Sequence, residues 1–271
     1  MLRRSQLFVP ANDEKKIRKS ATLSSDSIIF DLEDAVPETE KAKARVLLSS
    51  LLDILDWGDC ELCVRINKVG FGYSEEDLSF AARHAKLDSI VLPKVENIPY
   101  DLAKSCGKSL VPLVETAKGL LSLEKTVRLD GVTAVGYGPA DFALSLGGRT
   151  AAYSRNLFVK TQIVVTASAY GVDAIDSVFF DLSDLEGFRS EAIESRDLGF
   201  VGKQVVHPSQ IPIANQTYSP TGEEIAEARK VVVAYEKSVQ QNAGALRLDE
   251  KLVDAVHYRK AKQLIEKTHN P

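Results

Sequence analysis

Acidic side chains follow short apolar, β-branched runs of this sequence, at points where strands would end. Glu115 closes the run Leu110–Glu115, and Asp141 follows a run at 133–138. Two carboxylates at the ends of neighbouring strands could hold Mg²⁺, which prefers one or two protein carboxylates and completes its octahedron with other oxygens. A plainer interpretation also exists for each: Glu115 as the acidic charge at a helix start, and Asp141 as an N-cap or first-turn residue.

A basic side chain, Arg65, ends another such run at 60–67. A guanidinium at a strand end could hold a substrate carboxylate through two parallel hydrogen bonds. The same group could instead form a salt bridge with the acids that end the run at 27–34, which are Asp31, Glu33 and Asp34. Those three acids could orient metal-bound water or simply pair with nearby lysine and arginine side chains.

Two further candidates lie near the ends of the chain. Lys15 and Lys19 are four residues apart on a predicted helix at 13–22. Such a basic face is usually solvated, but at the rim of a site it could bind the phosphates of a nucleotide-like group. Asp254 precedes a predicted amphipathic helix at about 254–267, where an N-cap role would explain it without any catalytic function.

The elements that must position these side chains alternate along the chain. Eight β-rich runs are separated by helical patterns, at 6–10, 27–34, 60–67, 89–95, 109–115, 133–138, 172–179 and 200–208. Several runs are continuously apolar, as in strands that are covered on both faces. The count favours a single α/β (β/α)8 TIM barrel, whose active site is built at the C-terminal ends of its strands. A doubly wound open sheet is the alternative, although no phosphate-binding glycine motif supports it.

Beyond the barrel, the sequence predicts a C-terminal helical extension. We expect the barrel to span 1–216 and the extension 217–271, because residues 215–222 form a turn-rich connection. A long helix is predicted at 222–241, followed by a loop and the helix at 254–267. This segment could pack on the barrel or reach a neighbouring subunit.

The composition of the chain disfavours several classes of protein. The chain has 271 residues, 44% hydrophobic and 27% charged, with a net charge of −4. This balance does not favour a nucleic-acid or anionic-membrane partner, and no apolar run approaches the roughly 18 residues that span a bilayer. Three cysteines do not suggest a disulfide framework, and Cys60 and Cys63 are expected to be buried, unreactive thiols. We therefore expect a cytoplasmic protein.

Ordered sequence blocks give a more specific indication. The chain resembles the citrate lyase beta-subunit-like family of acyl-CoA lyases, within the HpcH/HpaI aldolase superfamily. The blocks that carry the resemblance are RRSQLFVP at 3–10, FDLEDAV at 30–36, VRIN at 64–67, LPKVE at 92–96, VETA at 114–117, GKQVVHP at 202–208 and the tail at 244–254. One departure lies in that tail, where Glu250 follows Asp249 at a position that is commonly glycine in the family.

The resemblance implies a (β/α)8 barrel that assembles into trimers or hexamers. By position it makes Glu115 and Asp141 the Mg²⁺ ligands and Arg65 an anchor for the substrate carboxylate and carbonyl. It also makes Lys15 and Lys19 contacts to CoA. Asp254 becomes the acid/base residue, delivered across a subunit contact by the C-terminal segment.

The implied reaction is cleavage of a 3-hydroxyacyl-CoA to acetyl-CoA and a small 2-oxo acid, or the reverse condensation. Citramalyl-CoA, which releases pyruvate, is the first expectation for the substrate, with malyl-CoA and citryl thioesters as alternatives. Two other hypotheses remain open: a Schiff-base aldolase that uses Lys94 or Lys203, and a non-catalytic barrel that binds acyl-CoA or an acyl carrier protein.

Overall fold

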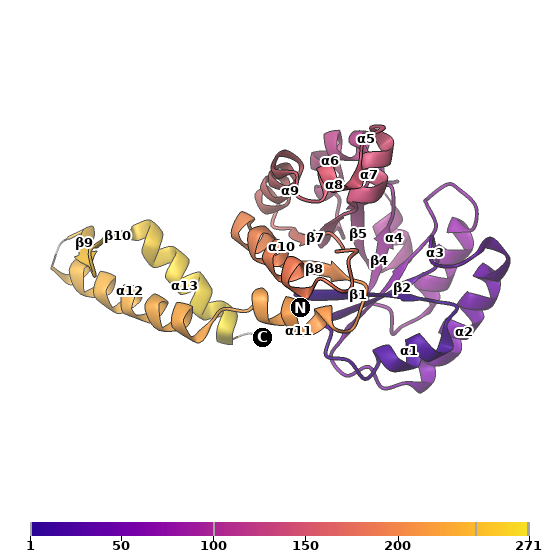
Figure 1. Cartoon of the computed structure of the whole chain (residues 1–271), viewed down its shortest axis with the longest axis horizontal. Coiled ribbons are helices and arrows are strands. Elements are labelled where there is room, and N and C mark those ends of the chain that lie inside the picture. The colour runs from indigo at the N-terminus through magenta and orange to yellow at the C-terminus, as the bar shows by residue number, and fades with distance from the viewer. Residues whose placement is uncertain (1, 100, 242, 270–271) are drawn as a thin grey trace. The chain divides into compact units, whose positions relative to one another are not determined.

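Eight parallel strands form a closed barrel in the computed structural model, which describes residues 2–99, 101–241 and 243–269 (Figure 1). The strands pair in chain order and β8 returns to β1: β1 Ser5–Pro10, β2 Ser27–Asp31, β3 Glu61–Arg65, β4 Ser89–Leu92, β5 Ser109–Val114, β6 Ala134–Tyr137, β7 Asp173–Asp176 and β8 Gly202–Val205. The predicted (β/α)8 barrel is therefore confirmed, and the open sheet is wrong.

Most strands are shorter than the runs in the sequence. The end of the run at 27–34, for example, leaves the ladder after Asp31. The backbone N–H of Leu32 still donates to the Arg65 carbonyl of β3, but those of Glu33 and Ala35 donate to the Asp31 side chain, in a loop of the barrel mouth. The polar ends of the runs are thus loop residues that the strands position.

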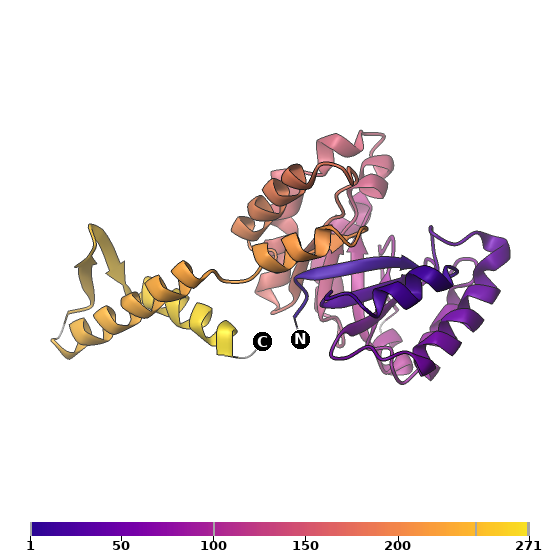
Figure 2. The same ribbon diagram turned by 60° about the horizontal axis from the view of Figure 1, so that its bottom comes forward.

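Helices lie on the outside of the strands, as α1 and α2 do (Figure 2). Their bounds are α1 Glu14–Ser20, the short 3-10 helix Glu38–Glu40, α2 Lys41–Ile54, α3 Ser74–Arg83, α4 Leu102–Cys106, α5 Ala117–Leu121, α6 Leu123–Val127, α7 Pro139–Ser145, α8 Thr150–Tyr153, α9 Leu157–Ala169, α10 Leu185–Leu198 and α11 Gln210–Thr217. Residues 117–127 form two short helices, α5 and α6, instead of one continuous helix. They are divided at Ser122, whose hydroxyl donates to the carbonyl of Glu96 at 2.9 Å.

Successive side chains of each strand point to opposite faces of the sheet, and this produces two apolar clusters. The inner cluster fills the barrel with Ile29, Cys63, Val91, Val111, Leu113, Ala134 and Ile175. The larger outer cluster packs the other strand face against the helices. Burial raises the pKa of Cys60 to about 12, and that of buried Cys63 well above its ordinary value, so both thiols are unreactive at neutral pH.

A second unit, Ser219–Pro271, follows the barrel unit Leu2–Tyr218. It contains α12 Gly222–Gln240, the antiparallel strands β9 Ala245–Leu248 and β10 Lys251–Asp254, and α13 Ala255–His269. The sequence did not predict this hairpin. Its two-residue turn places Asp249 and Glu250 at φ values of 45° and 67°, in the left-handed region that glycine occupies with least strain. Throughout the described residues, every helix is too short or too polar to cross a bilayer.

A buried ion pair closes the barrel at the N-terminal ends of its strands. Arg3 donates from Nε to Glu61 Oε2 at 2.9 Å and from Nη2 to Oε1 at 2.8 Å. Ser27 and Ser89 also donate to the Glu61 carboxylate, at 2.7 and 2.6 Å. Burial alone would raise the pKa of Glu61, but the hydrogen bond and charge of Arg3 outweigh burial and hold this pKa below its ordinary value.

Replacing Arg3 by methionine should lower the free energy of unfolding by about 3–5 kcal/mol, because it leaves the Glu61 charge buried and unpaired. Urea unfolding followed by circular dichroism measures this loss. Arg18→Met is the matched control, since it removes an exposed ion pair with Glu14 and should cost less than about 1 kcal/mol. Equal losses in the two variants would contradict the assignment of Arg3 as a buried anchor.

Candidate active site

Lys94 links the acidic residues at the barrel mouth. Its ammonium lies 2.7 Å from Glu33 Oε1, 3.2 Å from Asp34 Oδ2 and 3.8 Å from Asp141 Oδ1. Its backbone N–H donates to Glu115 Oε2 at 2.6 Å. One lysine therefore contacts acids that follow β2, β5 and β6, so the mouth brings Glu115 and Asp141 to the same residue.

Glu115 is buried directly after β5, with 4% of its surface exposed. Burial raises its pKa to about 7, despite the opposing charges of Arg65 and Lys94. Gly138 makes room for this side chain, because a Cβ at that position would lie 2.5 Å from Glu115 Cγ. Asp141 follows in the first turn of α7, as the plainer interpretation of the sequence expected, with its side chain 32% exposed.

Arg65 forms the salt bridge that was one of its two expected roles. Its Nε and Nη2 donate to the two oxygens of Asp31 at 2.7 and 2.6 Å. Burial would lower the pKa of Arg65, but Asp31 raises it well above its ordinary value, so the guanidinium stays charged. Nη1 lies 3.4 Å from Glu33 Oε2, and the guanidinium stacks over the Phe8 ring at 4.9 Å.

Asp31 also holds the loop that carries the other two acids of its run. Its carboxylate accepts the backbone N–H groups of Glu33 at 2.9 Å and of Ala35 at 3.1 Å. Each oxygen of Asp31 therefore accepts one hydrogen bond from Arg65 and one from the loop backbone. Glu33 is buried beside it, and burial raises the Glu33 pKa against the opposing charge of Arg65.

Two residues outside the predicted set of site residues support the same loop: Lys41, which sequence reasoning missed, and Asn67, which it noted only as a polar residue at a strand end. Lys41 is buried, and its ammonium donates to the carbonyls of Leu32 at 2.7 Å and Glu33 at 2.8 Å. Asn67 donates to the Leu32 carbonyl at 3.2 Å and to Asp77 at 2.6 Å. The signal for Lys41 was available: a lysine on the apolar face of a predicted helix must find buried acceptors.

The charges of this network do not balance when every acid is ionised. The network holds five carboxylates and three cations. Arg65 and Lys94 contact the carboxylates, whereas Lys41 bonds to the carbonyls of the loop that carries Glu33; the carboxylates are those of Asp31, Glu33, Asp34, Glu115 and Asp141. The excess is two negative charges, which matches one divalent cation. Glu115 and Asp141 also offer the hard oxygen ligands that Mg²⁺ prefers. Among the described residues, no group of three or more histidine, cysteine or acidic side chains forms a ready-made metal site.

The two lysines considered as Schiff-base nucleophiles are both held in charged form. The acids around Lys94 raise its pKa well above the ordinary value, although burial opposes them. Lys203 is fully buried, 2.7 Å from Asp176 and 2.6 Å from Glu191, and these acids likewise raise its pKa against the opposing effect of burial. A nucleophilic amine must be neutral, so neither environment favours that chemistry.

Lys15 and Lys19 are exposed on α1, beside neighbours that are paired. Lys16 contacts Asp13 and Arg18 contacts Glu14. No ion pair involves Lys15 or Lys19 within the part of the chain that the structure describes. Their ammonium groups are therefore accessible to an anionic ligand.

Asp254 ends β10 in the second unit and caps α13. Its Oδ1 accepts the backbone N–H groups of Val256 at 2.9 Å and His257 at 3.2 Å, as an N-cap does. The same oxygen lies 2.7 Å from His257 Nδ1. These hydrogen bonds, that of the His257 side chain above all, lower the pKa of Asp254. Sequence reasoning missed His257, although its spacing three residues after an N-cap acid was a usable signal.

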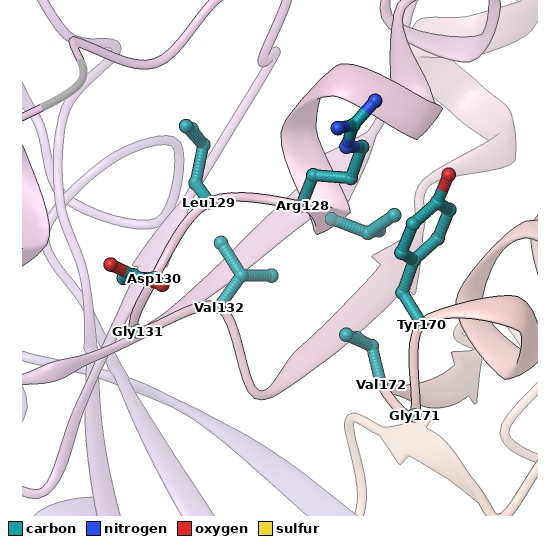
Figure 3. A pocket seen from close by; sticks show the side chains of 9 residues that line it. Arg128, Leu129, Asp130, Gly131, Val132, Tyr170, Gly171 and Val172 are labelled. Carbon is teal, nitrogen blue, oxygen red and sulfur yellow. The ribbon is translucent and has the colours of Figure 1, made fainter.

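A hollow of about 390 Å³ lies elsewhere, lined by residues 127–132 and 170–172 (Figure 3). These residues immediately precede β6 and β7, so the hollow is at the opposite end of the barrel from the carboxylates. Arg128 lies over the Tyr170 ring at 6.0 Å, and the Tyr170 hydroxyl donates to Glu124 at 2.8 Å. The hollow has no part in the acidic network.

The raised pKa of Glu115 predicts a pH dependence of stability for the metal-free protein. Between about 4.5 and about 7 the folded state keeps a proton that the unfolded state has lost, so the free energy of unfolding should fall as pH rises. Glu115→Gln has no carboxyl group to ionise, so its free energy of unfolding should rise relative to that of the wild type as pH rises across that range. Urea unfolding of both proteins in EDTA tests this, and parallel pH curves would contradict it.

Comparison with known proteins agrees with this geometry. Residues 4–208 match the family described as HpcH/HpaI aldolase/citrate lyase, and residues 154–270 match a C–C bond lyase of the TIM-barrel fold. Mitochondrial citramalyl-CoA lyase of Rattus norvegicus is 35% identical, covering 97% of this chain and 85% of its own. A (3S)-malyl-CoA thioesterase of Cereibacter sphaeroides is 34% identical, with coverages of 97% and 94%.

Among solved structures, the protein CitE from Mycobacterium tuberculosis, in complex with magnesium, acetoacetate and coenzyme A, superposes with a TM-score of 0.83. It is 30% identical, and the match covers 98% of each chain. The chain described here therefore belongs to the HpcH/HpaI aldolase/citrate lyase family of carbon–carbon lyases.

Proposed function

We propose that this enzyme is a Mg²⁺-dependent lyase that cleaves citramalyl-CoA into acetyl-CoA and pyruvate, or catalyses the reverse condensation. The observation that carries the proposal is the surplus of carboxylates over cations in the network that contains Lys94, at the mouth of a barrel whose family includes acyl-CoA lyases. The likeness to citramalyl-CoA lyase over 97% of the chain supports the choice of substrate.

Glu115 and Asp141 would hold the metal ion. The burial of Glu115 supports this role, because a carboxylate with a pKa near 7 gains from a nearby cation that favours its ionised form. When bound, Mg²⁺ supplies Lewis-acid stabilisation of the negative charge on the oxo-acid oxygen. Gly138 preserves the space in which the Glu115 carboxylate is held.

Arg65 would bind the carboxylate and carbonyl of the oxo acid. Asp31 fixes the guanidinium through two hydrogen bonds, and Phe8 supports its face. A donor held in place before the substrate arrives loses little conformational freedom on binding, so it can stabilise developing charge efficiently.

Asp254 would exchange the proton at the methyl carbon of acetyl-CoA. In the condensing direction its carboxylate removes that proton, and the lowered pKa keeps it ionised for this step. In cleavage the substrate hydroxyl loses its proton as the carbon–carbon bond breaks, and Asp254 in its protonated form gives one proton to the enolate carbon, so the number of protons is conserved. We assign Asp254 to the site of a neighbouring subunit in a trimer or hexamer, with Lys15 and Lys19 binding the CoA phosphates.

A second candidate is suggested by the malyl-CoA thioesterase relative, which is 34% identical. A barrel mouth of this kind could act on malyl-CoA, either by carbon–carbon cleavage or by thioester hydrolysis. Citryl thioesters and a purely acyl-CoA-binding role are the remaining alternatives. The products distinguish them, because only hydrolysis releases free malate.

The substrate prediction is tested with purified protein and a panel of citramalyl-, malyl- and citryl-CoA. We expect cleavage of citramalyl-CoA at the highest kcat/KM, with pyruvate detected by a coupled dehydrogenase. EDTA should abolish this activity and added Mg²⁺ should restore it, since the carboxylates alone cannot replace a Lewis acid. Full turnover in EDTA would contradict the metal assignment, and a preference for malyl-CoA would move the substrate assignment to the second candidate.

Asp254→Asn should retain binding of Mg²⁺ and CoA while losing more than about 100-fold in turnover, because an amide cannot transfer the proton. Calorimetry measures binding, and the pyruvate assay measures turnover. His257→Asn is a useful control, since it removes the imidazole beside Asp254 and keeps the carboxylate. Near-normal turnover of Asp254→Asn would contradict the proposed acid/base role of Asp254.

A further inference from the structure

Lys94 occupies an unusual backbone conformation at the centre of the acidic network. Its φ is 51°, in the left-handed region that side-chain-bearing residues adopt only when the surroundings impose it. That conformation directs the backbone N–H to Glu115 while the ammonium contacts the loop acids and approaches Asp141. The two carboxylates proposed to hold Mg²⁺ are thus both in contact with Lys94.

The ammonium is the cation that these acids meet when no metal is bound. It is 2.7 Å from Glu33 and 3.2 Å from Asp34, and the Lys94 side chain is only 23% exposed. Arg65 is the other cation near Glu33, at 3.4 Å, and it is committed to Asp31. Without Lys94, acids from three loops would face one another with little compensation.

We infer that Lys94 is an internal counter-ion that holds the metal-free site together and limits the affinity of Glu115 and Asp141 for Mg²⁺. This inference rests on the proposed magnesium site. A divalent ion at Asp141 meets the positive charge of Lys94 nearby, and like charges a few ångströms apart in a partly buried site repel appreciably. Lys94 is therefore a positioning residue whose charge sets how readily the ion binds and leaves.

This role differs from a purely structural one in the sign of its effect. A residue that only shaped the site would weaken Mg²⁺ binding when replaced. Removing the Lys94 charge should instead tighten binding, while the metal-free protein loses stability because Glu33 and Asp34 lose their partner. The two effects move in opposite directions in one variant.

The experiment is Mg²⁺ titration by isothermal calorimetry, with melting temperatures in EDTA and in Mg²⁺. Lys94→Met, which keeps the chain length and removes the charge, should tighten the Kd for Mg²⁺ by about tenfold. Its melting temperature in EDTA should fall, and the rise caused by Mg²⁺ should exceed that of the wild type. Lys94→Arg retains the charge and should keep a Kd within about threefold of wild type.

Lys125→Met removes an exposed lysine of α6 and should leave the Kd unchanged. If Lys94→Met fails to fold, Lys94→Gln provides the neutral side chain. Unchanged or weaker Mg²⁺ binding in the neutral variant, with normal binding by the wild type, would overturn this inference alone. Absence of Mg²⁺ binding by the wild type would overturn the proposed metal site and the inference together.

Discussion

Electrostatic compensation at the mouth of the barrel is the constraint on which the site depends. A closed parallel barrel brings the C-terminal ends of all eight strands to one rim, so acids that are far apart in sequence must face one another. Buried carboxylates are costly unless a cation or hydrogen-bond donors balance them. The chain supplies Arg65, Lys94 and Lys41, and their charges fall short of the acids by two.

The two ends of the barrel satisfy this constraint differently. At the N-terminal ends, Arg3 and Glu61 form a closed pair in which serine hydroxyls complete the hydrogen bonding. Arg3 compensates the buried Glu61, also lies 3.3 Å from the partly exposed Asp173, and serves stability. At the mouth, Glu115 keeps a raised pKa because its burial is not fully compensated. An imbalance of this kind is typical of functional sites, where a ligand supplies the missing charge.

The loop after β2 shows how rigidity is provided around that imbalance. Asp31 binds Arg65 and two backbone N–H groups, while Lys41 binds two carbonyls of the same loop. Charged side chains thus satisfy backbone groups that no strand partner reaches. Glu33 is held in a buried position that disfavours its ionised form. Functional side chains need such fixed positions, which their neighbours must provide.

The sequence by itself determined the order of the strands and their closure into a barrel, because apolar runs at a regular spacing with helices between them allow few other folds. It also placed acids after several of these strands, since such residues stand out against apolar runs. The ordered blocks identified the family, which the matched residues 4–208 confirm. Element bounds were less well determined, because most strands end before the sequence runs do, as β2 does at Asp31.

Only the tertiary structure decided which of these acids share a partner. Lys94 and Glu33 are 61 residues apart in the chain, and their contact depends on a left-handed φ that no local pattern indicates. Lys41 and His257 had usable local signals, but only the structure shows which groups they contact. The hairpin at 245–254 was missed because its turn lacks glycine, and local propensity therefore did not favour it. Long-range contacts of this kind arise when a chain closes on itself, so they cannot be read from neighbouring residues.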